Sequence, residues 1–181
     1  SDVYKRQGLN RMEASKDIAV VLRSEIDTQG CLAGPCILKT KLEDFLTDAT
    51  MHEEVFGPAT LMVEYEDANE LMKVAEKLEG QLTASFFGTI EDLNAHADLV
   101  ESLETKAGRL IFNQFPTGVE VCGAIVHGGP YPATTDGRST SVGEGAILRF
   151  VRPVCYQGFP DDLLPEALRE ANPLGITRSE S

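Results

Sequence analysis

The sequence predicts an α/β fold built on parallel strands. Between residues 59 and 112, short apolar segments alternate with segments whose apolar residues recur at helical spacing. Capping residues and glycines mark where those helical segments should begin and end. Hydrophobic residues make up 42% of the 181 positions, which is ordinary for a globular protein with a sizeable core. Two strand–helix–strand units in series imply right-handed crossovers and a parallel sheet covered on both faces.

The first quarter of the chain predicts two strands and a short helix. Residues 18–22, Ile-Ala-Val-Val-Leu, form an apolar run typical of a buried strand, and residues 27–30 predict a turn. Extended structure resumes at 35–39. The pattern Thr40-x-x-Glu43 then fits a capping box that opens a short helix through Leu46.

The middle of the chain contains the two repeated units. Residues 61–65 predict a strand, Asp67 a helix cap, and Gly80 a left-handed helix end. Residues 82–87 predict the next strand, Thr89 caps a second helix that Gly108 closes, and residues 109–112 predict a third strand. The predicted apolar stripes are Ala68, Leu71, Met72, Ala75 and Leu78 in the first helix, and Leu93, Ala97, Val100 and Leu103 in the second.

The last third changes character. Gly, Pro, Thr and Ser crowd residues 116–145, and a loop of this length in a compact domain is usually functional. Residues 147–156 alternate apolar and polar, which predicts a strand with one solvated face, and Pro153 suits an edge position. A short helix is expected from Pro165 to Ala171.

Residues 51–58, Met-His-Glu-Glu-Val-Phe-Gly-Pro, are the most informative motif. In an extended segment, Glu54 and Phe56 share one face and Glu53 and Val55 the other. A carboxylate can accept two hydrogen bonds, which suits the adjacent hydroxyls of a ribose, and a phenyl ring two residues on can lie beside an attached base. The alternative is an acidic turn before a strand.

This motif resembles the Glu-Glu-x-Phe-Gly-Pro signature of the aldehyde dehydrogenase superfamily. The resemblance implies a partial Rossmann-like parallel sheet of that family's catalytic domain, with Glu54 holding the nicotinamide ribose of NAD or NADP and Phe56 flanking the ring. It also implies oxidation of an aldehyde to a carboxylate. The sequence does not choose between NAD and NADP, because the adenosine end binds upstream in the family.

Residues 108–113 resemble the family strand that leads to the mouth of the substrate tunnel, so the loop 114–120 should line that mouth. Phe115 then supplies an apolar wall or, alternatively, core packing. Cys122 is expected as a further wall. His127 stands where the family places an aromatic residue facing the catalytic centre, and an imidazole there can hydrogen-bond a substrate carboxylate, or its ring is satisfied by the loop backbone.

Residues 127–143 and 149–157 depart from the common superfamily pattern and are similar to the branch of α-ketoglutaric semialdehyde (2,5-dioxopentanoate) dehydrogenases. In the family, the nucleophilic cysteine and the general-base glutamate lie well upstream. We therefore expect residues 8–181 to be the C-terminal part of the catalytic domain, inactive alone. Cys31 lies too close to Glu54 to be the nucleophile. The resemblance also implies that residues 146–157 form an oligomerisation strand that pairs with another subunit, giving a homo-oligomer.

Residues 1–7, Ser-Asp-Val-Tyr-Lys-Arg-Gln, have no clear helical or strand pattern and resemble a translated adaptor peptide, so we expect a non-native leader. The net charge of −13 argues against nucleic acid as a partner, and the sequence has no apolar run long enough for a membrane span. The four cysteines form no C-x-x-C pair, which predicts no metal site and a cytoplasmic protein.

Two alternatives stay open from the sequence. The chain could be a non-catalytic binding module that keeps the fold and uses the long loop for a protein partner. It could also belong to another superfamily branch that acts on a different aldehyde.

Overall fold

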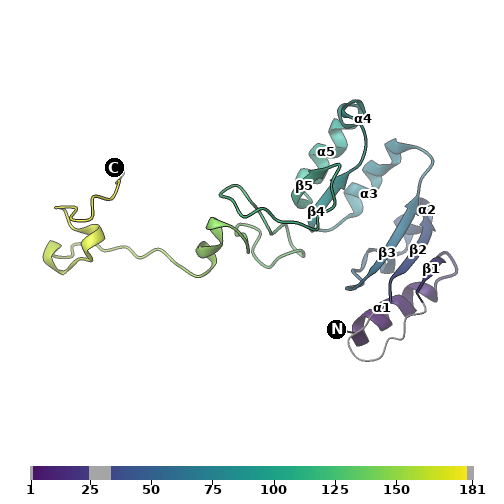
Figure 1. The fold of residues 1–181 in the computed structure, drawn as a ribbon, viewed down its shortest axis with the longest axis horizontal. Helices are drawn as coiled ribbons and strands as arrows, with labels where there is room; N and C mark the ends of the chain where they lie inside the picture. Colours follow the sequence, from purple (N-terminus) through teal and green to yellow (C-terminus); the bar gives the residue numbers. More distant parts are fainter. Residues whose placement is uncertain (1, 25–33, 179–181) are drawn as a thin grey trace. The chain divides into compact units, whose positions relative to one another are not determined.

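The computed structural model describes residues 2–24 and 34–178, with side chains from Gln7 onward. The turn expected at 27–30 and Cys31 lie outside these residues. Contacts divide the chain into two compact units, Ser1–Ala146 and Ile147–Ser181. The first unit contains two separate small sheets, whereas the sequence predicts a single parallel sheet (Figure 1).

The first sheet has three strands in the order β1-β2-β3, namely β1 (Ala19–Arg23), β2 (Cys36–Lys41) and β3 (Ala59–Glu64). Strands β2 and β3 run parallel, with Leu38 opposite Leu61, while β1 runs antiparallel to β2. The accompanying helices are α1 (Asp2–Glu13), α2 (Leu42–Thr47) and the 3₁₀ turn η1 (Ala49–His52). Helix α1 includes most of the first seven residues, so the expectation that they lack a helical pattern was wrong.

The core of this half lies between the strands and their helices. Leu38, at the centre of this core, is 1% exposed. The buried cluster joins residues from α1, β2, α2 and η1: Leu9, Met12, Ile18, Cys36, Leu38, Phe45 and Met51. Val55, Ala59, Leu61 and Val63 are half-buried and pack against this cluster, so the motif at 51–58 is attached to the core through alternate residues.

Two local predictions failed in this half. The apolar run at 18–22 is not a buried strand, because β1 is an edge strand whose five residues are all exposed. Helix α2 has Lys41 as its N-cap without a side-chain cap, so the predicted capping box does not form. The hydroxyl of Thr40 instead donates to the carbonyl of Asp17 at 2.8 Å, and Thr40 is buried. A tertiary contact outcompetes the local cap at this position.

The second sheet is a parallel pair, β4 (Gln81–Phe86) and β5 (Ala107–Phe112), with Thr83 opposite Arg109. It is preceded by the 3₁₀ turn η2 (Ala68–Glu70), capped by Asp67, and by α3 (Leu71–Lys77). The second predicted helix is divided at His96 into α4 (Ile90–Ala95) and α5 (Ala97–Glu104). Ala75 is the buried member of the first predicted stripe. In the second segment the buried residue is Leu99, which the predicted stripe omitted, while the predicted Ala97 is exposed.

Gly80 and Gly108 have a different role from the predicted one. Neither adopts a positive φ, so neither ends a helix in the left-handed region. A side chain at Gly80 would collide with the carbonyl of Pro130, and one at Gly108 with the carbonyl of Gly128. These glycines therefore allow residues 128–130 to lie tightly against the amino ends of β4 and β5.

The remainder of the chain has little regular structure. Residues 113–143 form turns and loops, followed by the 3₁₀ turn η3 (Glu144–Arg149). The second unit contains η4 (Asp161–Leu163) and η5 (Glu166–Leu168) in place of the single helix expected at 165–171. Residues 151–157 form neither helix nor strand. A strand needs a neighbour for its backbone hydrogen bonds, and no described residue pairs with this segment, so the expected strand does not form here.

Candidate functional site

The segment between η1 and β3 is held at both ends. Met51, in η1, is 4% exposed in the core, and Val55 packs against the same core. Glu53 has extended backbone angles of −72° and 133°. Gly57 has φ of 152°, which residues with a Cβ rarely adopt, and the carbonyl of Pro58 accepts a hydrogen bond from the amide of Cys36 at 2.9 Å. Between these fixed points, Glu53, Glu54 and Phe56 are exposed and Val55 is half-buried.

Glu54 and Phe56 lie on either side of the half-buried Val55, and both are exposed. Phe56 is 75% exposed, and Glu54 forms no hydrogen bond or ion pair with any residue that the structure describes. Both side chains line a cavity of about 500 Å³ whose other lining includes Met51, Gly57 and Leu61. An unengaged carboxylate and an exposed phenyl ring thus border one cavity.

Glu53 is engaged elsewhere. Its carboxylate accepts a hydrogen bond from Nη1 of Arg11 in α1 at 3.0 Å. Both side chains are more than half exposed, so the pair contributes little to stability. Glu53 lines the same two cavities as Glu54, so the two glutamates differ in their partners: Glu53 is paired with α1, and Glu54 has no partner among the described residues.

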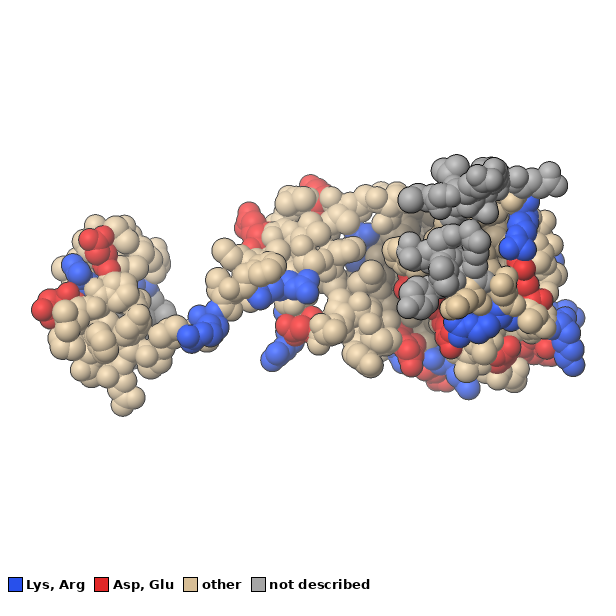
Figure 2. All heavy atoms as spheres, turned by 90° about the horizontal axis from the view of Figure 1, so that it is seen from below, with Lys and Arg blue, Asp and Glu red and all other residues tan. Residues whose placement is uncertain are grey.

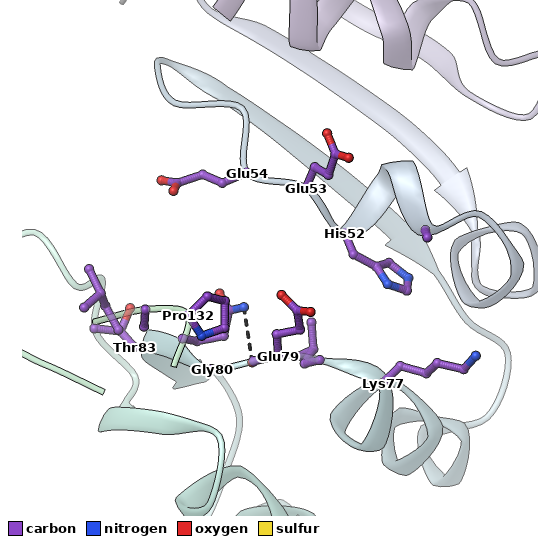
Figure 3. Close-up of a pocket in the computed structure, with 13 residues that line it drawn as sticks. His52, Glu53, Glu54, Lys77, Glu79, Gly80, Thr83 and Pro132 are labelled. Atoms are coloured by element: carbon purple, nitrogen blue, oxygen red, sulfur yellow. Dashed lines mark hydrogen bonds between the residues drawn. The ribbon is translucent and has the colours of Figure 1, made fainter. Parts of the chain in front are cut away.

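A second cavity, of about 900 Å³, is also lined by Glu53 and Glu54 (Figure 3). The segment 52–54 borders it on one side, and the start of β4 with Pro132 borders it on the other. Its charged lining residues are Glu53, Glu54, Glu79 and Lys77. Three carboxylates against one ammonium group make this opening a poor environment for a phosphate.

His52 anchors the start of the segment. Its Nε2 lies 2.7 Å from the carbonyl of Phe45, and the two rings contact each other with centroids 4.5 Å apart. One residue before η1, the side chain of Asp48 accepts hydrogen bonds from the hydroxyl and the amide of Thr50. These hydrogen bonds hold the pKa of the Asp48 carboxyl below its usual value, and they fix the turn from which Glu54 emerges.

Phe115 lies beyond the carboxyl end of β5. It is 73% exposed, and its ring contacts that of Phe87, which follows β4, with centroids 5.0 Å apart. Asn113 joins the two strand ends, because its side-chain amide exchanges two hydrogen bonds of 2.9 Å with the backbone of Gly88. Asn113 itself has φ of 53°. Phe87 was not singled out from the sequence.

Cys122 and His127 are half-buried in the long loop. The carbonyl of Cys122 accepts a hydrogen bond from the amide of Ile125. The amide of His127 donates to the hydroxyl of Thr140 at 2.9 Å, and its carbonyl accepts hydrogen bonds from Ser141. The backbone of His127 is therefore fixed by residues 140–141.

The predicted site residues are thus distributed over the first unit. Glu54 and Phe56 share a cavity, whereas Phe115, Cys122 and His127 line neither of the two cavities beside Glu54. Phe115 lies past the carboxyl end of β5, and Gly128, next to His127, packs on Gly108 near its amino end. These ends are separated by roughly 17 Å in a strand of this length. A substrate path that touches both would run along the strand.

Three wider observations concern the described residues as a whole. Among residues 2–24 and 34–178, no group of three or more His, Cys, Asp and Glu side chains is placed to hold a metal ion. Within the same ranges, no helix has the length and hydrophobicity to cross a membrane. Acidic and basic side chains are interspersed on the face seen in Figure 2.

The fold and the site define the class first: an α/β protein with parallel strand pairs and a carboxylate–aromatic pair beside a cavity. Residues 7–139 match the aldehyde dehydrogenase family. The chain is 47% identical over 178 residues to α-ketoglutaric semialdehyde dehydrogenase 2 of Azospirillum brasilense, covering 98% of this chain and 34% of that protein. It is 53% identical over 128 residues to α-ketoglutaric semialdehyde dehydrogenase of Acinetobacter baylyi, covering 71% of this chain and 24% of that protein. The chain belongs to the aldehyde dehydrogenase family.

Solved structures agree on the fold. The Δ-pyrroline-5-carboxylate dehydrogenase of Mycobacterium tuberculosis superposes with a TM-score of 0.64 at 20% identity, covering 90% of this chain and 31% of that one. The same enzyme bound with NAD gives 0.61. The chain spans about a third or less of the length of each of these relatives.

Proposed function

We propose that this chain forms the C-terminal part of the catalytic domain of an NAD- or NADP-dependent aldehyde dehydrogenase, and that the full-length enzyme oxidises 2,5-dioxopentanoate to 2-oxoglutarate. The observation that carries the proposal is the pair formed by Glu54 and Phe56 at one cavity. The relatives named for α-ketoglutaric semialdehyde support the choice of substrate.

The residues at this cavity fit the nicotinamide end of the cofactor. The carboxylate of Glu54 has no partner within the described part of the chain, so it can accept hydrogen bonds from two ribose hydroxyls. The exposed ring of Phe56 can lie against a planar base. When bound, the nicotinamide supplies the acceptor for a hydride from the substrate.

The remaining roles follow from the placement of the loop residues. Phe115 and Cys122 would line the path by which the aldehyde enters, and His127 would lie further in and hydrogen-bond the substrate carboxylate. The nucleophilic thiol and the general base would come from upstream of this chain, so the isolated chain would be inactive. Residues 146–157 would pair with another subunit, and the enzyme would be a cytoplasmic homo-oligomer.

The test compares two neighbouring glutamates in the full-length enzyme, with NAD(P)H formation as the readout. Glu54→Gln should raise the KM for the cofactor about tenfold or more, because hydrogen bonds to a charged group contribute about 1.5–3 kcal/mol. Glu53→Gln is the matched control, since Glu53 pairs with Arg11, and it should change that KM less than about twofold. Equal effects of the two substitutions would contradict the assignment.

The substrate is tested separately. The full-length enzyme should oxidise 2,5-dioxopentanoate with a higher kcat/KM than unsubstituted aldehydes of similar length. A preference for another aldehyde would keep the family assignment and reject this substrate.

A further inference from the structure

Arg109 makes an unusual connection between a strand and the loop that follows it. It is the third residue of β5. Its Nη1 donates to the carbonyl of Gly118 at 3.0 Å, and its Nη2 donates to the carbonyl of Pro116 at 3.3 Å. The loop therefore turns back along the strand from which it came and is held there by one side chain.

The strand end of this connection is well fixed. Arg109 is paired with Thr83 of β4, and the adjacent Gly108 packs tightly on Gly128. Arg109 is half-buried, and its Nε is buried with no hydrogen-bond partner among the residues that the structure describes. The guanidinium is thus restrained in the orientation that directs its two terminal nitrogens toward the loop.

The loop residues 114–118 depend on the hydrogen bonds from Arg109 more than the strand does. Residues 114–118 are all exposed, and the second restraint on them is the contact between the rings of Phe115 and Phe87. A guanidinium is the side chain best suited to hold such a segment, because its planar fork can serve two carbonyls at once. An ammonium group concentrates its charge at one point and serves this pair less well.

We propose that Arg109 is a positioning residue of the substrate entrance: by holding the carbonyls of Pro116 and Gly118, it fixes the segment 114–120 that presents Phe115 to the incoming aldehyde. This inference rests on the proposed function. Two of the five N–H donors of Arg109 hold the loop carbonyls, and we assign its effect on substrate capture to that backbone rather than to direct binding of a substrate carboxylate.

The experiment uses the full-length enzyme with Arg109→Met and Arg109→Lys, assayed on 2,5-dioxopentanoate and on pentanal, which lacks the carboxylate. Lys106→Met is the matched control, because Lys106 lies three residues away and donates to the carbonyl of Glu76 rather than to the loop. Hydrogen exchange of the peptide containing 114–120 is measured for every variant. It reports on the loop whether or not the enzyme turns over.

Arg109→Met should raise the KM for both aldehydes about tenfold, with kcat within about threefold, since only binding is weakened. Arg109→Lys should fall between the wild type and Arg109→Met, and it carries the test if Arg109→Met does not fold. Both variants should accelerate exchange in 114–120, and Lys106→Met should change neither quantity.

Three results would overturn the proposal: unchanged exchange in 114–120, faster exchange with unchanged KM, or a KM rise confined to 2,5-dioxopentanoate, which would mean direct binding of the 2-oxo acid end that pentanal lacks. A wild-type enzyme that oxidises no aldehyde is a different failure. It would reject the proposed function, while the exchange measurement would still show whether Arg109 holds the loop.

Discussion

Glu54 and Phe56 are both exposed on either side of Val55, which packs on the core, and Glu53 is exposed as well. Extended geometry is enough to expect this of Glu54 and Phe56, whose role at a cofactor stays a prediction. Phe87 and Arg109 could not be found in this way. Their partners, Phe115 and the carbonyls at 116 and 118, are brought to them by the return of the loop, which no local pattern encodes.

Thr40, which is buried, also makes a contact that the local sequence pattern does not predict. Its spacing to Glu43 predicts a capping box, but its hydroxyl donates to Asp17 across the fold. We expect Thr40→Val to lower the free energy of unfolding by about 1 kcal/mol, because a partly buried hydrogen bond is lost. Urea unfolding measures this change. Thr60→Val, an exposed threonine of β3, is the control and should have an effect below about 0.5 kcal/mol.

At the scale of elements, the start of α4 was predictable and its end was not. Thr89 and Asp92 form a reciprocal capping box, which the sequence indicates through Thr89. The break at His96 has no marker such as Gly or Pro, so the sequence suggested one continuous helix. The break at His96 lies three residues before Leu99, which is the buried residue of α5.

The capping box predicts a pH dependence. The amide and hydroxyl of Thr89 donate to the Asp92 carboxylate and lower its pKa below 3.8. A lowered pKa gives stability that is present above the unfolded value and is lost as pH falls through the folded value. Asp92→Asn should therefore be less stable than the wild type at pH 7, and the difference should shrink below pH 3.8. Urea unfolding at pH 7 and below pH 3.8 measures this difference in stability, with Glu91→Gln as the control. A difference independent of pH would exclude the carboxylate as its source.

The segment 147–156 was predicted as a strand from its alternation, but residues 147–149 belong to η3, and residues 151–156 form no strand with any residue that the structure describes. Ile147, Leu148, Phe150 and Val154 are each more than half exposed. Apolar side chains exposed in this number favour association with another chain.

We expect Phe150→Asp, in the full-length enzyme, to shift assembly toward smaller species, because a charge would be buried in the subunit contact. Light scattering after size-exclusion chromatography measures the change. Glu166→Gln, in η5 of the same unit, is the control. An unchanged mass for Phe150→Asp would place the subunit contact elsewhere.

For the molecule as a whole, the fold class was predictable and the strand order was not. Alternating strands and helices identify parallel pairing, and β2–β3 and β4–β5 are both parallel. The sequence cannot show that β3 and β4 are not neighbours, because adjacency in a sheet depends on which other strands insert between them. In the described structure each of these strands ends a sheet.

This arrangement predicts how the isolated chain behaves. β3 and β4 present unpaired backbone groups at sheet edges, and Val20, Val21 and Leu22 of β1 are about half exposed. Unpaired edges and apolar surface drive association, so we expect the purified 181-residue chain to form concentration-dependent aggregates and to bind a hydrophobic dye. It should also form no NADH or NADPH from 2,5-dioxopentanoate, because under the proposed function its residues would supply the cofactor clamp without the nucleophile. Light scattering and a spectrophotometric assay test both points: a monodisperse monomer would argue for a self-contained binding module, and turnover would show that the nucleophile lies within this chain.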